Sequence, residues 1–189
     1  MKYHAEVVFP NLVHVVETDV NQDIKDHCLT RKLNNPTGVF NSNCGGWQSE
    51  QERQGLITDK LYEIINETIQ QSFNNKLVIA GSWVNINPTG SFNSKHLHPQ
   101  CDLSGVYYIQ VPEKSGDIVF EHPQLHAAHG EVDSYTPKIK EGMGQHSVIS
   151  ITPSNGLLMV FPSYLSHGVL PNEAKEDRIS ISFNIRITG

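Results

Sequence analysis

Residues 178–187 read Arg-Ile-Ser-Ile-Ser-Phe-Asn-Ile-Arg-Ile, in which apolar and polar side chains alternate almost without a break. Because successive side chains of a β-strand point to opposite faces, this pattern predicts a half-buried antiparallel strand over 179–187. Shorter runs rich in β-branched and aromatic residues precede it, at 77–80, 82–86, 104–111, 117–120, 147–151 and 157–161. A series of short strands without intervening helices after residue 76 predicts a mainly β fold, a β-sandwich or jelly roll.

Two helical patterns come before the strands. The first runs from Asn21, its expected N-cap, to Leu33. In the second, Ser49 and Glu52 have the spacing of a capping box, and an apolar face follows at Leu56, Ile57, Leu61, Ile64, Ile65 and Ile69. Such a helix needs a sheet to cover. We therefore expect one domain over residues 1–189, in which helices of residues 1–75 pack on one sheet of a core formed by 76–189.

Composition and charge exclude several classes of protein. The chain has 189 residues, of which 38% are hydrophobic and 18% charged, and its formal net charge is −6. Nucleic-acid binding needs clustered Lys and Arg, so the acidic charge disfavours it. No apolar stretch approaches the roughly 18 residues of a membrane span. Without a signal peptide pattern or a CxxC pair, we expect a cytoplasmic protein with reduced thiols.

The sequence His96-Leu97-His98-Pro99 is the first candidate for a metal site. Side chains at positions i and i+2 of an extended backbone project from the same face, so both imidazoles can reach one metal ion. Pro99 lacks an amide hydrogen and ends strand pairing, as expected at the open mouth of a barrel. A facial triad requires a third ligand from elsewhere in the chain and leaves three positions open for substrate and dioxygen.

His167 is the candidate for that third ligand, because it follows an apolar strand that ends in Phe161-Pro162. Arg178 lies eleven residues later, at the head of the last strand, and Ser180 shares its face. A guanidinium beside a hydroxyl is well shaped to bind a carboxylate through charge-assisted hydrogen bonds. Together these residues predict a metal site next to a site for a carboxylate ligand.

In these motifs the chain resembles the 2-oxoglutarate/iron(II) oxygenases found in phages and marine bacteria. The residues that match that family's pattern are Trp83, Asn85, His96–Pro99, Leu103–Tyr108, Phe161, Pro162, His167 and Arg178–Asn184. The resemblance is dense over residues 77–187. It implies a double-stranded β-helix of the jelly-roll or cupin-like type. A phage-encoded member would act in the cytoplasm of its host.

The resemblance also implies an activity and its cofactors. The expected activity is that of a 2-oxoglutarate-dependent oxygenase of the hydroxylase type, with iron(II) on His96, His98 and His167 as catalytic metal ligands. The far carboxylate of 2-oxoglutarate, the one that does not bind iron, is then expected at Arg178 and Ser180. Two further residues are assigned to the cofactor site, Tyr108 and Asn85. Tyr108 is preferred to its neighbour Tyr107 because it shares a strand face with Val106 and Gln110.

His98 departs from the usual pattern of such enzymes, in which an aspartate occupies this position. Three neutral imidazoles leave the metal site one unit more positive than two imidazoles and a carboxylate. Asp102, four residues further on, is the alternative carboxylate ligand. The ligand set therefore remains open at one position, although His96 and His167 belong to either version.

Two other functions remain as alternatives. One is a cupin-like dioxygenase with three histidines and no keto acid, which Arg178 and Ser180 disfavour because nothing then explains a carboxylate clamp. The other is a non-enzymatic jelly-roll binding module. The substrate is not encoded in any motif, and a homodimer would be formed through exposed sheet edges. Four histidines in the irregular segment 122–146, namely His122, His126, His129 and His146, are expected in a lid.

Overall fold

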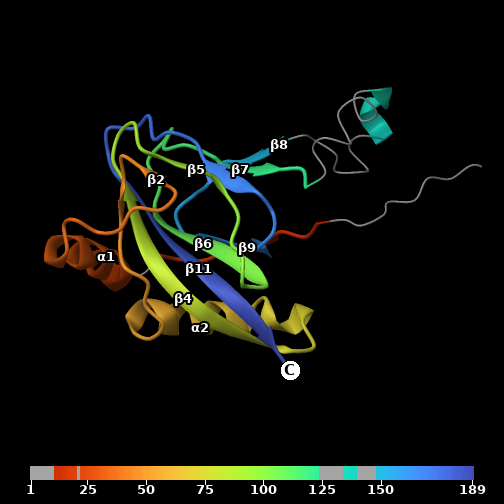
Figure 1. The fold of residues 1–189 in the computed structure, drawn as a ribbon, viewed down its shortest axis with the longest axis horizontal. Coiled ribbons are helices and arrows are strands. Elements are labelled where there is room, and N and C mark those ends of the chain that lie inside the picture. The colour runs from red at the N-terminus through yellow and green to blue at the C-terminus, as the bar shows by residue number, and fades with distance from the viewer. Residues whose placement is uncertain (1–10, 21, 124–133, 140–147) are drawn as a thin grey trace, which may run out of the picture.

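The computed structural model describes residues 11–20, 22–123, 134–139 and 148–189, which build two antiparallel sheets (Figure 1). The larger sheet has the strand order β1 (His14–Glu17), β9 (Leu157–Pro162), β6 (Leu103–Gln110), β11 (Arg178–Thr188), β4 (Lys76–Asn87) and β3 (Trp47–Gln48). The smaller sheet has the order β2 (Asn43–Cys44), β5 (Phe92–His96), β10 (His167–Val169), β7 (Ile118–Glu121) and β8 (Val148–Ile151). The predicted mainly β, jelly-roll architecture is confirmed.

Strand β11 lies in the middle of the larger sheet, paired with β4 on one side and with β6 on the other. Its odd-numbered side chains, from Ile179 to Ile185, belong to the core on the helical side of the sheet. Its even-numbered side chains lie on the opposite face, where Arg178 and Ser180 are buried too. The strand was predicted as half-buried, but at its start both faces are buried because the second sheet covers the polar one.

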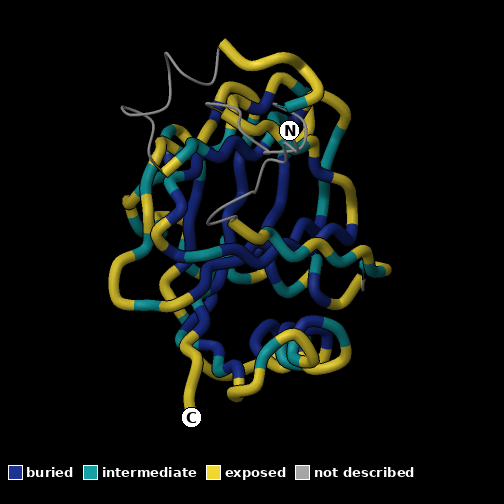
Figure 2. Tube along the Cα trace, turned by 90° about the vertical axis from the view of Figure 1, so that its right-hand side faces the viewer, coloured by how far each residue is buried: buried dark blue, intermediate teal, exposed yellow. Residues whose placement is uncertain are grey.

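The helices cover the outer face of the larger sheet, as predicted. Helix α1 spans Gln22–Asn34 and helix α2 spans Leu56–Glu67, followed by a 3₁₀ turn at Gln70–Ser72. The apolar side of α2 packs against the odd-numbered side chains of β11 and the inner side chains of β4. Figure 2 shows the buried chain concentrated in the strands, while exposed chain follows the loops and the outer surface of the helices. No helix of the described residues is long and apolar enough to cross a membrane.

The capping box predicted at Ser49 and Glu52 does not form. Ser49 pairs with β4 instead: its amide donates to the carbonyl of Val84, and its hydroxyl accepts from the Val84 amide at 2.9 Å. Helix α2 begins later, after Gly55, which has a φ of 124° that favours glycine. Tertiary pairing with the sheet outweighed a local capping signal here. The N-cap predicted at Asn21 lies outside the described residues.

Several short elements were not predicted from the sequence. Strands β5 and β10 carry the candidate metal ligands His96 and His167, yet β10 has only three residues and β5 is mostly polar. A helical turn at 137–139 also interrupts the strands that were expected to run on without helices after residue 76. Most of the histidine-rich segment, including His126, His129 and His146, lies outside the described residues. Short elements of this kind are specified by their partners rather than by their own periodicity.

Candidate active site

The smaller sheet brings three histidines together. His96 ends β5, His167 begins β10, and the two residues are paired across the strands. His98 lies two residues beyond β5, and its amide donates to the carbonyl of Ser163 at 3.0 Å. One nitrogen from each of the three rings lies within 4.8 Å of the others. This is the separation needed for three imidazoles to share one metal ion.

Backbone carbonyls fix two of the rings. Nδ1 of His96 donates to the carbonyl of Ser94 at 2.7 Å, and Nδ1 of His167 donates to the carbonyl of Leu165 at 2.8 Å. A carbonyl can only accept, so Nδ1 carries the proton in both rings and Nε2 presents its lone pair. Metal-binding histidines characteristically have their second nitrogen held in this way, which sets both tautomer and orientation.

Burial keeps His98 and His167 neutral. The pKa of His167 is lowered to about 3, mainly by desolvation; the hydrogen bond to the Leu165 carbonyl opposes this, and the neighbouring His96 and His98 add smaller lowering effects. Desolvation also lowers the pKa of His98 to about 4, with His96 as the second cause. A neutral imidazole is the form that binds a metal. At neutral pH His98 and His167 can therefore bind a cation without first losing a proton.

Asp102, the alternative ligand, lies outside this cluster. Its carboxylate accepts a hydrogen bond from the amide of Ile187 at 2.8 Å, and its amide donates to the carbonyl of Ile185. Asp102 thus joins the chain to the end of β11 and is absent from the group of side chains that could hold a metal. Within the described residues, the geometry of the cluster favours His98 over Asp102.

A narrow cavity between the two sheets adjoins the histidines. The cavity is lined by the three histidines and by the inward-facing side chains of β4, β6 and β11, among them the four predicted cofactor residues Asn85, Tyr108, Arg178 and Ser180. Tyr107 points the other way, where its hydroxyl contacts the hydroxyl of Thr18 at 3.1 Å. The alternation of β6 therefore placed Tyr108, and not Tyr107, beside the cavity.

Arg178 is a buried cation without a matching carboxylate. It is 1% exposed, and its Nη1 donates to the backbone carbonyls of Ser115, Gly116 and Leu170. No carboxylate pairs with it within the part of the chain that the structure describes. Desolvation lowers the pKa of Arg178, as burial of a positive charge does. Because an isolated buried charge is costly, an anion that enters the cavity would be strongly favoured.

Two more polar groups in the cavity lack partners. The hydroxyl of Tyr108 and the side-chain oxygen of Asn85 are buried without a hydrogen bond, although the amide nitrogen of Asn85 donates to Ser182 at 3.0 Å. Desolvation raises the pKa of Tyr108, so the phenol stays protonated and remains a donor. Unsatisfied groups of this kind are rare in native interiors. With Arg178 they fit a carboxylate-bearing ligand such as 2-oxoglutarate.

Some lining residues were not predicted as site residues. Ser182 continues the face of Arg178 and Ser180, so the alternation of the strand could have identified it. Trp83 was noted only as a motif residue, yet its ring lies 5.7 Å from that of His98 between centroids. Ser42 comes from the loop before β2, and no sequence signal connects it with the strands that it contacts.

Comparison with known proteins agrees with this geometry. Residues 81–184, more than half of the chain, match a family model described as "Putative 2OG-Fe(II) oxygenase". No curated protein matches the sequence. Among solved structures, a prolyl-4-hydroxylase from Pseudomonas putida is similar at a TM-score of 0.62 and 17% identity, covering 94% of this chain and 93% of that one.

Two further structures share the fold. The viral collagen prolyl hydroxylase of Paramecium bursaria Chlorella virus-1, in complex with 2OG, has a TM-score of 0.56 and 14% identity, covering 93% of this chain and 96% of its own. EctD from S. alaskensis with bound Fe has a TM-score of 0.61 and 12% identity, covering 94% and 73%. At these identities the structures support the fold, while the family model supports the chemistry. The chain belongs to the 2OG-Fe(II) oxygenase family, and it is a non-haem iron(II) oxygenase that depends on 2-oxoglutarate.

Proposed function

We propose that His96, His98 and His167 hold the catalytic iron(II) and that Arg178 binds the far carboxylate of 2-oxoglutarate. The single observation that carries the proposal is the buried guanidinium of Arg178, which lines the same narrow cavity as the three histidines and has no carboxylate partner among the described residues. A dioxygenase without a keto acid would leave this buried charge unexplained. A non-enzymatic module would have no use for three rings converging on one point.

The four predicted cofactor residues then each have a task. Arg178 neutralises the far carboxylate, and Ser180 supplies a hydroxyl beside it. Tyr108 and Asn85, whose polar atoms lack partners, orient the keto acid by donating and accepting hydrogen bonds. Iron(II) with bound 2-oxoglutarate supplies the activation of dioxygen and the oxidising power for hydroxylation.

The apolar walls keep water away from the site. Phe161 packs edge-on against His167 with 4.7 Å between ring centroids, and Phe120 lies 6.1 Å from the same ring. Val106, Ile118 and Val169 also line the cavity with apolar side chains. In a dry site the charge-assisted contacts of Arg178 are stronger than in water, and reactive species are protected from side reactions.

Three wider proposals concern the branch of the family, the compartment and the assembly. The HxHP and Arg-x-Ser-x-Ser-Phe-Asn motifs support a place in the phage and marine bacterial branch of the family. Action in the cytoplasm, or in the host cytoplasm for a phage protein, is supported by the three cysteines, all of which are free thiols. Pairing of two chains is supported by the exposed apolar side chains of edge strand β8, Val148 and Ile149, and sedimentation at varied concentration tests it.

The experiment for the proposed site is an anaerobic titration with iron(II) followed by 2-oxoglutarate. Chelation of iron by the keto acid gives a weak visible charge-transfer band, which we expect at one equivalent of each. Iron binding without the band would leave a metal site but overturn the role of 2-oxoglutarate. Failure to bind iron would overturn the whole proposal.

A further inference from the structure

A second, wider cavity opens on the other side of the histidines. It has a volume of about 640 Å³, within the range of pockets that take small molecules. Its walls come from the segment 39–51, from Ser94, His96 and His98, and from Trp83 and Asn184. It shares Ser42, Trp83, His96 and His98 with the narrow cavity. A molecule in this groove would therefore lie next to the proposed iron, whereas Arg178 lines only the narrow cavity.

The two cavities differ in charge. Among the residues that the structure describes, the narrow cavity is lined by Arg178 and no carboxylate, whereas the groove is lined by one carboxylate, Glu50, and by no Lys or Arg. A dianion such as 2-oxoglutarate is therefore drawn to the narrow cavity. The groove instead favours a neutral or cationic molecule, and the net charge of −6 adds a field of the same sign.

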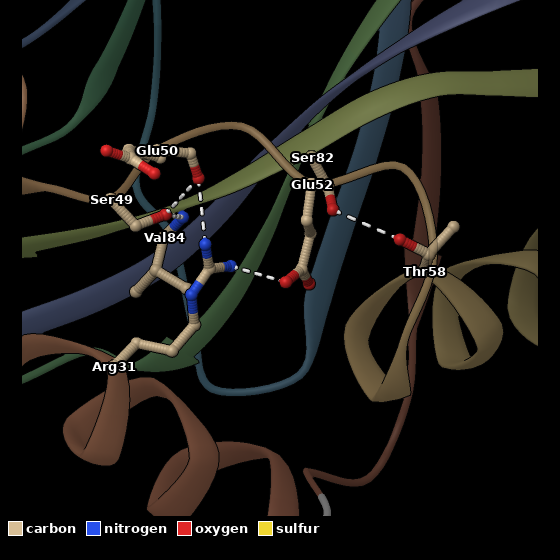
Figure 3. Close-up of polar contacts among 7 residues, drawn as sticks. All are labelled: Arg31, Ser49, Glu50, Glu52, Thr58, Ser82 and Val84. Carbon is tan, nitrogen blue, oxygen red and sulfur yellow. Dashed lines mark hydrogen bonds and ion pairs between the residues drawn. The ribbon is translucent and has the colours of Figure 1, made fainter. Parts of the chain in front are cut away.

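The carboxylate of Glu50 is left free by the way its segment is held (Figure 3). Arg31 of α1 uses Nη2 to donate to the backbone carbonyl of Glu50 at 2.8 Å, while its Nη1 forms an ion pair with Glu52 at 2.7 Å. The Ser49 hydroxyl donates to the same carbonyl at 2.9 Å. Arg31 thus neutralises Glu52 and not Glu50, whose carboxylate makes no hydrogen bond or ion pair within the described part of the chain.

The rest of the lining suits a cation with a hydrogen-bonding body. Seven further side chains of the described lining offer an amide or hydroxyl group: Asn41, Ser42, Gln48, Ser49, Gln51, Ser94 and Asn184. Trp83 adds a half-buried aromatic ring at the junction with the histidines. A carboxylate and an indole ring in one groove are the two groups that attract an ammonium or guanidinium most effectively.

We propose that this groove binds the substrate of the oxygenase and that the substrate carries an ammonium or guanidinium group that pairs with Glu50. The inference rests on the proposed function, since it takes the histidine cluster as the place of reaction. The cation could belong to a free polyamine or to a lysine side chain of a peptide, which share this chemistry. Arg31 is then a positioning residue, because it holds the backbone of Glu50 without occupying its carboxylate.

The test is calorimetric titration of the anaerobic protein loaded with iron(II) and 2-oxoglutarate. Three probes are compared: spermidine, the tripeptide acetyl-Gly-Lys-Gly-amide, and its neutral counterpart acetyl-Gly-Gln-Gly-amide. We expect at least one cationic probe to bind, and to bind about three- to tenfold more tightly than the neutral one. Preference for spermidine would identify a free polyamine as the source, and preference for the lysine tripeptide would identify a peptide.

Matched variants assign the effect to Glu50. Glu50→Gln should weaken the cationic probe about three- to tenfold and leave the neutral probe unchanged. Glu67→Gln removes the same charge from the exposed end of α2 and should change neither. The inference is overturned by any of three results. These are that no cationic probe binds, that the neutral tripeptide binds as tightly as the cationic probes, or that Glu50→Gln and Glu67→Gln have the same effect on the affinity for the cationic probe. If the inference fails but the iron(II)–2-oxoglutarate charge-transfer band is still seen, the proposed function stands and only the substrate class is wrong. If the band is missing as well, the proposed function itself is overturned.

Discussion

His96 and His167 are paired across the β5–β10 ladder, and each donates from Nδ1 to the carbonyl two residues before it in the chain. The same local hydrogen bond thus orients both rings so that their Nε2 atoms, on neighbouring strands, point to one place. His98 completes the group without such a bond among its described contacts, and its ring stacks on that of His167 at 12° between planes. The site is therefore built from a rigid pair and one ring held by its backbone and neighbours.

Replacing one ring should separate metal binding from folding. We expect His167→Ala to weaken iron(II) binding by more than about a hundredfold, because a lost ligand costs more than a lost supporting contact. Asp102→Asn should leave iron affinity unchanged, since that carboxylate bonds to the Ile187 amide. Anaerobic iron titration measures both. A large loss in Asp102→Asn would restore the aspartate as a ligand.

The role of Arg178 is tested by Arg178→Met, which keeps most of the length of the side chain. We expect loss of the 2-oxoglutarate band with iron(II) affinity unchanged, because the guanidinium lines the narrow cavity rather than joining the metal cluster. The substitution removes a costly buried charge but also the donor of three backbone carbonyls, so these two effects on stability oppose each other. Arg186→Met, on the exposed end of the same strand, is the control. Loss of iron in Arg178→Met would mean that the residue is structural.

The metal-free protein should lose stability as the pH falls. His98 and His167 have pKa values lowered to about 4 and about 3 by burial, whereas an unfolded chain has about 6.5. Below about pH 6.5 these histidines therefore bind protons in the unfolded state but stay unprotonated in the folded state, which lowers the stability of the folded state. Between about pH 7.5 and pH 5 we expect a loss on the order of 1–2 kcal/mol per histidine in urea unfolding. Equal stability at both pH values would contradict the neutral, buried state of the rings.

Gly105 allows the central strands to pack closely. A β-carbon at this position would lie 2.3 Å from the ring of Phe183 and 2.8 Å from the carbonyl of Met159, and the carbonyl cannot move away cheaply. We expect Gly105→Ala to destabilise the protein by about 1–3 kcal/mol, as overpacking does. Gly90→Ala is a useful comparison, since nothing lies within 4 Å there and only its positive φ adds strain. Thermal unfolding of both variants measures the difference.

Arg31 should matter to the groove as well as to stability. Arg31→Met would leave the half-buried Glu52 without its ion pair and release the carbonyl of Glu50. We expect a loss of about 1–2 kcal/mol of stability. The lysine tripeptide should bind more weakly, while the 2-oxoglutarate band is retained. A variant with unchanged peptide affinity would show that Arg31 supports only the fold.

Regular alternation and motif spacing predicted most of the fold and several of the side chains that line the narrow cavity. The alternation in β11 predicted that the side chains of Arg178 and Ser180 share one face of the strand, and both line the cavity. The alternation in β6 likewise places Tyr108, rather than Tyr107, beside the cavity. Such predictions succeed because side-chain direction in a strand follows directly from position.

The misses arose where partners decide the structure. Ser49 looked like a helix cap, but its amide and hydroxyl are used by β4. Strand β10 is too short for any periodicity and exists because β5 and β7 flank it. The groove needs Glu50 and Ser42 from the N-terminal half beside Trp83 and Asn184 from the strands, and no local pattern reports such contacts.

The most direct test of the central claim is a crystal structure of the anaerobic protein with iron(II) and 2-oxoglutarate, with the metal located by anomalous diffraction at the iron edge. We predict one iron bonded to Nε2 of His96, His98 and His167, with the far carboxylate of the keto acid on Arg178. Iron bonded to Asp102 in place of His98, or a keto acid away from Arg178, would contradict the account.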